Sequence, residues 1–315
     1  MKHVNIIADI GATNARFALL EIGQTELLQQ HTLVAADYAD LTAAVSAYVK
    51  MIESPQVNAA CIAIAGPVHK PVFTLANNHW QVNKDEVEKL LNCQVQWLND
   101  FAAQAWGVTA LAPEQQVIVK SGRGVSEGNR LVVGPGSGLG VAGLVRNKGD
   151  WVPVIGEGGH VSFAPGTDQQ AAVLSYLQTK YEHVSIERVA SGSGIPVLYQ
   201  AMAHLSKQNA VYTRAVQISQ AAEQGDKLAQ QTMQMFFAIL GQGVASAALQ
   251  MGALGGVYLV GGILPKLLDQ LKNSEFKMVF AQRGRFRNYL EDIPITLSLD
   301  QELGLKGAAM ALQNS

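Results

Sequence analysis

The sequence of 315 residues has few cysteines, few charges and no dense basic run. Two cysteines, Cys61 and Cys93, are too few for the disulfide framework of a small secreted protein, and no C-x-x-C pair offers thiolates to zinc. Charged residues make up 15% of the chain, and the formal net charge is −2. We therefore expect two buried thiols in a reducing compartment, with neither nucleic acid nor an anionic membrane as a partner.

Signals for secretion and for membrane insertion are weak. The first residues, "MKHVNIIADIG", turn acidic and glycine-rich before the apolar region of a signal peptide could form. Residues 228–265 carry no charge and are long enough to span a bilayer, but five glutamines interrupt them. A buried helix followed by a buried strand explains this stretch better. We expect a soluble cytoplasmic protein with no membrane partner.

The chain has enough apolar residues, at 48%, to bury a large core, and its length suits two domains. Apolar runs and helical spacing predict strands at 4–11, 15–22, 29–35, 59–66 and 93–100, with helices at 38–52, 83–92 and 101–111. The pattern restarts at 129–160 as three strands joined by turns. Helices are then expected at 169–182, 185–190, 195–206, 213–223, 226–251, 264–272 and 303–313, with strands at 255–263 and 293–299.

Each half begins with a strand, a tight glycine turn and a second strand. The segments are "ADIGATNARFALL" (8–20) and "VGPGSGLGVAGLV" (133–145). This order differs from a Rossmann domain, in which the first strand leads directly into a helix. Two such turns facing each other would form a cleft between domains.

The first turn, "DIGATNAR", is suited to phosphate. Gly11 and Ala12 are small enough for backbone N–H groups to approach phosphate oxygens, and Thr13 offers a side-chain hydroxyl. The negative charge of Asp9 would repel a phosphate group at direct contact, but its carboxylate can hold Mg²⁺ through water. An ordinary hairpin turn with a solvated Asp9 is an equally good interpretation of this segment alone.

The second turn, "GPGSGLG" (134–140), has four glycines in seven residues, more than a plain hairpin needs. It resembles a phosphate loop, although no G-K-[ST] follows and a strand rather than a helix comes next. Later in the chain, Gly261 and Gly262 lie where a strand gives way to a helix. A flat base or ribose could lie against their backbone, and a tight junction is the plain alternative.

Three further acids and an imidazole are candidate ligands. Glu157 and His160, in "GEGGHVSFAP", could hold neighbouring hydroxyls of a sugar, or simply be surface residues. For Glu187, in "SIERVASGSG", the periodicity of the sequence predicts a position on the surface of a helix. Asp100, in "WLNDFAAQAWG", follows a strand and begins a helix, so it could cap that helix or act as a base at the edge of a sheet.

Taken together and in order, these turns resemble the hexokinase–Hsp70–actin superfamily, and within it the bacterial glucokinases of the non-ROK type. The resemblance covers nearly the whole chain and is carried by "DIGATNAR", "AGPV", "NNHW", "LNDF", "GPGSGLGVA", "GEGGHVSFAP", "ERVASGSG", "GGVYLVGGI" and "GRF". The sequence departs from the family pattern at Ala8 and Ala12, where glycine is usual. The cysteine-rich zinc motif of ROK kinases is also missing after His160.

The resemblance implies roles for these positions. Asp100 matches the catalytic base, which takes the proton of the sugar 6-hydroxyl, and Asn99 matches a neighbour that binds a ring hydroxyl. Glu157, His160 and Glu187 match residues that hold the remaining hydroxyls. Nucleotide binding is implied for three segments. They are the first phosphate loop at Ala8, Asp9, Ile10, Gly11, Ala12 and Thr13, the second at Gly136, Ser137 and Gly138, and an adenosine turn at Gly261 and Gly262.

The implied architecture is an α/β, two-domain, actin-like ATPase (ribonuclease H-like) fold, in which mixed sheets with flanking helices enclose a cleft. We expect a small domain at 1–110 plus 300–315 and a large domain at 111–299, with hinges near 107–113 and 300. The implied function is phosphorylation of glucose by ATP and Mg²⁺ in a cytoplasmic homodimer. The alternatives are a kinase for another hexose, a catalytically silent sugar-binding regulator, and a chaperone or filament ATPase.

Overall fold

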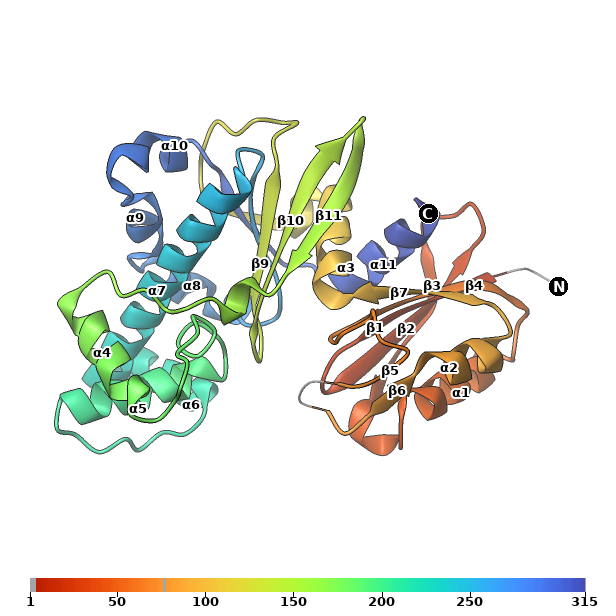
Figure 1. Cartoon of the computed structure of the whole chain (residues 1–315), viewed down its shortest axis with the longest axis horizontal. Coiled ribbons are helices and arrows are strands. Elements are labelled where there is room, and N and C mark those ends of the chain that lie inside the picture. The colour runs from red at the N-terminus through yellow and green to blue at the C-terminus, as the bar shows by residue number, and fades with distance from the viewer. Residues whose placement is uncertain (1–3, 76–77, 315) are drawn as a thin grey trace. The chain divides into compact units, whose positions relative to one another are not determined.

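The computed structural model describes residues 4–75 and 78–314. The chain divides into two compact units (Figure 1). Unit 1 comprises Met1–Leu111 and Asp300–Ser315, and unit 2 comprises Ala112–Leu299. Each unit is described by itself.

Unit 1 is built on a five-stranded mixed sheet in the order β3-β2-β1-β4-β7. β1 is antiparallel to β2 and parallel to β4, which is parallel to β7. The carboxyl ends of β1, β4 and β7 therefore share one edge of the sheet. The strands are β1 (Val4–Ile10), β2 (Asn14–Glu21), β3 (Leu27–Val34), β4 (Val57–Ile64) and β7 (Gln94–Asn99), with a separate hairpin of β5 (Val72–Thr74) and β6 (Gln81–Asn83).

Helices cover both faces of this sheet because its strands are apolar on both sides. Ile6, Ala8 and Ile10 belong to a core shared with α1 (Leu41–Met51) and α2 (Lys84–Leu91). Ile7, on the opposite face, packs with α3 (Asp100–Gly107) and α11 (Leu303–Gln313). Asp40 caps α1, accepting a hydrogen bond of 2.7 Å from the N–H of Ala43.

Unit 2 contains a six-stranded mixed sheet in the order β11-β10-β9-β12-β13-β8. β9, β12 and β13 are parallel to one another, and the remaining pairs are antiparallel. The carboxyl ends of β9 and β12 are thus neighbours at one edge. The strands are β8 (Gln116–Lys120), β9 (Arg130–Pro135), β10 (Leu139–Asn147), β11 (Asp150–Gly156), β12 (Gly256–Leu259) and β13 (Ile295–Ser298).

The helices of unit 2 pack around α7 (Lys227–Met251), which is central to the core. By length and composition α7 could cross a membrane, but 67% of its most apolar window is buried within the unit. The expected buried helix and following strand are therefore present. The other helices are α4 (Asp168–Gln178), α5 (Gly194–Leu205), α6 (Ala215–Glu223), α8 (Leu268–Lys272), α9 (Phe276–Ala281) and α10 (Arg287–Glu291), with short 3₁₀ turns η1 to η6 at Ala35–Asp37, Val108–Ala110, Pro113–Gln115, Gly158–His160, Leu264–Leu267 and Gly284–Phe286.

Some sequence expectations differ from the structure. The helix expected at 185–190 is wrong: this segment is a series of turns. The N–H groups of Ile186 and Glu187 bond the loop at 159–163, and the segment's own hydrogen bonds make only short turns. The short elements β5, β6, β8, α9 and α10 were not expected, since each is too brief to show a period. Cys61 is buried as expected, and burial raises the pKa of its thiol to about 12. Cys93 is only half-buried.

Candidate active site

The acid of "LND" begins α3, at the edge of the unit 1 sheet where β7 ends. The cap of this helix is Asn99, whose side-chain oxygen accepts hydrogen bonds from the N–H groups of Phe101 (2.9 Å) and Ala102 (3.2 Å). Asp100 is the first helical residue and is not the cap that periodicity favoured. The Phe101 N–H also donates to Asp100 Oδ1 at 3.0 Å, so this side chain lies at the N-terminus of α3, where the helix dipole attracts negative charge.

The first glycine turn shares this edge of the sheet. Ile10 pairs with Ile64 of β4, and Ile64 pairs with Asn99 of β7. Two strand spacings, roughly 10 Å, therefore separate the end of β1 from Asn99. Gly11 closes the turn by donating to the Asn14 carbonyl at 2.9 Å. This edge of the unit 1 sheet thus carries Asn99, Asp100, the last β1 residues Ala8, Asp9 and Ile10, and the turn of Gly11, Ala12 and Thr13.

Asp9 lies on the face of the sheet that α3 and α11 cover. Its side chain is buried, and Arg16, its cross-strand neighbour, lies 3.5 Å away. Burial raises the pKa of Asp9, and the Arg16 guanidinium partly opposes that shift. Gly304 of α11 leaves room for this carboxylate, because a Cβ there would be 2.8 Å from Asp9 Oδ2. The C-terminal helix therefore packs closely against Asp9.

The second glycine turn joins β9 and β10 in unit 2. The Gly136 N–H donates to the Gly138 carbonyl at 2.8 Å, and the Gly192 N–H donates to the Gly136 carbonyl at 2.8 Å. Ser193 Oγ donates to the Ser137 carbonyl at 2.7 Å. The segment 191–194, which sequence reasoning did not single out as functional, thus supports this turn. Its "SGSG" composition beside Glu187 was the available signal.

The turn at Gly261 and Gly262, proposed from the resemblance to hold adenosine, follows β12, the strand beside β9. Leu259 pairs with Val133, and the Val260 N–H donates to the Val133 carbonyl at 2.9 Å. Gly261 has a φ of +88°, which suits glycine, and both Gly261 and Gly262 are exposed. The structure therefore places Gly136, Ser137 and Gly138 and the Gly261–Gly262 pair at adjacent strand ends.

The proposed sugar loop follows β11. Glu157 precedes the short turn η4, and His160 is its last residue. Their side chains are 82% and 60% exposed, with the His160 Nε2 and Glu157 Oε2 atoms 4.0 Å apart. Among residues 4–75 and 78–314, no cluster of three or more His, Cys, Asp or Glu side chains could hold a metal ion. Both side chains are exposed and therefore accessible to a ligand.

Glu187 is not on a helix surface. It is half-buried in the turns at 185–190, and its Oε2 accepts a hydrogen bond of 2.8 Å from the N–H of Leu139, directly after the second glycine turn. Its own N–H donates to the Gly159 carbonyl at 3.0 Å. Glu187 thus contacts both the second glycine turn and the loop that carries Glu157 and His160.

Comparison with known proteins gives consistent matches along the chain. A family model described as Glucokinase matches residues 6–315. The glucokinase of Chromohalobacter salexigens is 42% identical over 315 residues, which are 100% of this chain and 99% of the relative. That of Neisseria meningitidis serogroup B is 39% identical over 311 residues, 98% of this chain and 94% of the relative.

The chain belongs to the glucokinase family.

Solved structures agree with this assignment. A glucokinase from an Antarctic psychrotroph has a TM-score of 0.88 at 36% identity, covering 100% of both chains. A ROK-family glucokinase from Streptomyces griseus, in complex with glucose and AMPPNP, has a TM-score of 0.68 at 20% identity, covering 99% of this chain and 100% of that one. At this low identity the match supports a shared fold only. The actin-like ATPase fold implied by the sequence is therefore confirmed.

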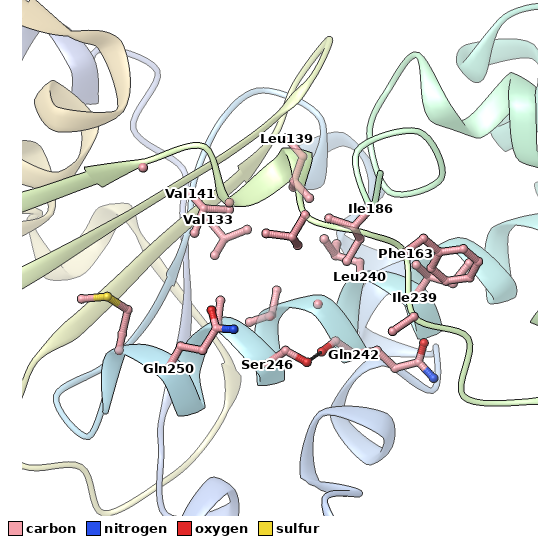
Figure 2. Close-up of a pocket in the computed structure, with 18 of the residues that line it drawn as sticks. Val133, Leu139, Val141, Phe163, Ile186, Ile239, Leu240, Gln242, Ser246 and Gln250 are labelled. Atoms are coloured by element: carbon pink, nitrogen blue, oxygen red, sulfur yellow. Dashed lines mark hydrogen bonds between the residues drawn. The ribbon is translucent and has the colours of Figure 1, made fainter. Parts of the chain in front are cut away.

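Unit 2 of this glucokinase-family chain contains a cavity with an almost uncharged lining. It has a volume of about 470 Å³ and lies in unit 2 between the β-sheet and α7, which carries Gln242, Ser246 and Gln250 along one wall (Figure 2). Arg283 is the one ionisable side chain among the described lining residues. Without a carboxylate, imidazole or thiol the cavity offers no general base, so the glycine turns remain the candidate site.

Replacing Asp9 by asparagine is expected to raise the melting temperature at pH 7 when nucleotide and Mg²⁺ are absent. The pKa of Asp9 is raised by burial above its ordinary 3.8. Above pH 3.8 the unfolded chain therefore binds fewer protons than the folded one, and this group lowers stability as pH rises. Asparagine removes that cost, so the gain should shrink as pH falls toward 4. Melting curves between pH 4 and 8 measure it; a lower melting temperature at pH 7 would mean that the pair with Arg16 outweighs desolvation.

Proposed function

We propose that the chain transfers the γ-phosphoryl group of ATP to the 6-hydroxyl of D-glucose, giving glucose 6-phosphate and ADP and feeding glycolysis. The observation that carries this proposal is the placement of Asp100, at a helix N-terminus on the same sheet edge as a phosphate-type glycine turn. Membership of the glucokinase family supports glucose as the acceptor. The glucose and AMPPNP of the Streptomyces griseus structure support the choice of ligands.

Asp100 acts in this proposal as the general base. It accepts the proton of the 6-hydroxyl as that oxygen attacks phosphorus, a step typically worth ~10²–10⁴-fold in rate. The Phe101 N–H donates to this carboxylate at 3.0 Å, and the N-terminus of a helix is a favourable place for negative charge. Asn99 uses its amide oxygen to cap α3, which leaves the amide nitrogen to donate to a ring hydroxyl.

The remaining hydroxyls are assigned to Glu157, His160 and Glu187. Carboxylates accept hydrogen bonds from hydroxyl groups, and the imidazole can donate or accept. These residues belong to unit 2, and Asp100 belongs to unit 1. Exclusion of water from the bound substrates would keep water from competing with the sugar as phosphoryl acceptor.

ATP is assigned to the backbone of the two glycine turns and to Gly261–Gly262. Mg²⁺ usually keeps several waters and takes only one or two protein carboxylates, so the single buried carboxylate of Asp9 fits such an ion through water. When bound, the ion neutralises charge on the transferring phosphates. Asp9 would then exchange a weak partner, Arg16 at 3.5 Å, for a stronger one.

The setting proposed for this reaction is the cytoplasm, with the protein acting as a homodimer on small-molecule substrates. The low charge and the absence of dense basic runs in the sequence support a function without nucleic acid or a membrane surface. Ultracentrifugation of the purified protein would test the subunit count.

The test is steady-state ATP turnover with Mg²⁺ across a panel of glucose, mannose and N-acetylmannosamine. The account predicts the highest kcat/KM for glucose. Turnover restricted to another hexose would favour the kinase alternative, and binding of glucose without turnover would favour the silent regulator. The retained acid at position 100 argues against the latter.

A further inference from the structure

The second glycine turn is held from outside by two segments. On one side Gly192 and Ser193 bond the carbonyl groups of Gly136 and Ser137. On the other side the Leu139 N–H bonds Glu187 Oε2 at 2.8 Å, across 48 residues of sequence. The turn's own Gly136–Gly138 hydrogen bond fixes only its tip.

Gly138 and Glu187 are in close contact. A Cβ at position 138 would collide with Glu187 Oε2 and would lie 3.2 Å from the carboxyl carbon. The absence of a side chain at Gly138 is therefore what admits the carboxylate to the turn. Any movement of this carboxylate changes the surroundings of Gly138 and Leu139.

This contact lies beside the cavity of unit 2. Leu139 and Ile186, the residue before Glu187, both line that cavity of about 470 Å³ (Figure 2). The hydrogen bond from Leu139 to Glu187 therefore joins two segments of the cavity wall.

We propose that Glu187 is a positioning residue for the second glycine turn as well as a ligand of the sugar, so that one side chain couples nucleotide affinity to sugar affinity. This inference rests on the proposed function and deepens it. One carboxylate oxygen holds the Leu139 N–H, while Oε1 has no hydrogen-bond partner within residues 4–75 and 78–314. A sugar hydroxyl that donates to Oε1 fixes the carboxylate and, through Oε2, the nucleotide turn.

The backbone of Glu187 extends the same connection. Its N–H bonds the Gly159 carbonyl at 3.0 Å, and Gly159 precedes His160 in η4. The nucleotide turn and the sugar loop are therefore joined through this one residue. Because binding linkage is reciprocal, glucose should raise ADP affinity by the same factor by which ADP raises glucose affinity.

The experiment compares E187A, E187Q and H160A by isothermal titration with ADP in the absence of sugar, and with glucose in the absence of nucleotide. E187A removes the acceptor of the Leu139 N–H, and its Kd for ADP should rise at least fivefold. E187Q keeps an oxygen for that N–H and places a donor toward the sugar. Its Kd for ADP should stay within about twofold of the unmodified protein, while its Kd for glucose rises at least tenfold. H160A should weaken the binding of glucose and leave the Kd for ADP unchanged.

If Glu187 had a purely structural role, E187A and E187Q would not differ in this way in their affinities for ADP and glucose. An ADP affinity of E187A that is unchanged or higher overturns the proposal, as does an equal loss in E187A and E187Q, which would assign the effect to charge. If E187A does not fold, E187D, one methylene too short to reach Leu139, is expected to show the same loss of ADP affinity. The turnover assay with unmodified protein judges the proposed function separately, since ADP titrations need no sugar.

Discussion

Replacing Asp100 by asparagine is expected to lower kcat for glucose phosphorylation by about 10²–10⁴-fold, the usual contribution of a general base. Asparagine has nearly the same shape and can still accept a hydrogen bond from the Phe101 N–H, so α3 and its Asn99 cap should persist. Its amide cannot take a proton from the 6-hydroxyl. The loss should therefore fall on kcat, with a smaller change in KM for glucose and for ATP, measured by steady-state kinetics.

A matched control is Asp85→Asn. Asp85 also lies in the first turn of a helix of unit 1, α2, but it is exposed, and α2 follows β6, which is not a strand of the five-stranded sheet. Its kcat should match that of the unmodified protein. An Asp100→Asn variant that kept near-normal kcat would mean that Asp100 is not the base, whatever the control shows.

Replacing Gly307 by alanine is expected to destabilise the protein by about 1–3 kcal/mol, the typical cost of overpacking. In an open helix the same change would add stability, roughly 0.5–1 kcal/mol. The sign reverses because α11 crosses α3 at this point, and a Cβ at Gly307 would collide with the Ala103 carbonyl. The helices must then separate, which displaces Gly304 from Asp9 and disturbs α3, whose first residue is Asp100.

Chemical denaturation with urea measures this change. Gly156→Ala is the control, because its added methyl group would meet no atom within 4 Å and no positive φ is involved. It should change the free energy of unfolding by less than about 0.5 kcal/mol, as surface changes commonly do. A Gly307→Ala protein as stable as the original would show that the α3–α11 crossing is looser than described.

The sequence predicted the elements at the site better than the contacts between them. The strand and helix on either side of Asn99 and Asp100 followed from their apolar patterns. Which residue caps the helix did not, because asparagine and aspartate are equally good caps and only backbone geometry separates them. The structure assigns the cap to Asn99.

Contacts between distant segments were beyond a single sequence. Glu187 read as a helix-surface acid because its partner, the Leu139 N–H, is 48 residues away. The segment 185–190 became turns because its backbone groups bond the loop at 159–163. Gly304 and Gly307, three residues apart on α11, were visible as small residues on one helical face, but their contacts with Asp9 and Ala103 lie two or three hundred residues earlier in the chain.

The most direct test of the central claim is phosphorus and proton NMR of the products formed from ATP, Mg²⁺ and glucose. The account predicts ADP and a single new phosphomonoester in equal amounts, with the phosphorus coupled to the C6 methylene protons of glucose. Release of ADP with inorganic phosphate alone, or a phosphoryl group on any other carbon of the sugar, would contradict it.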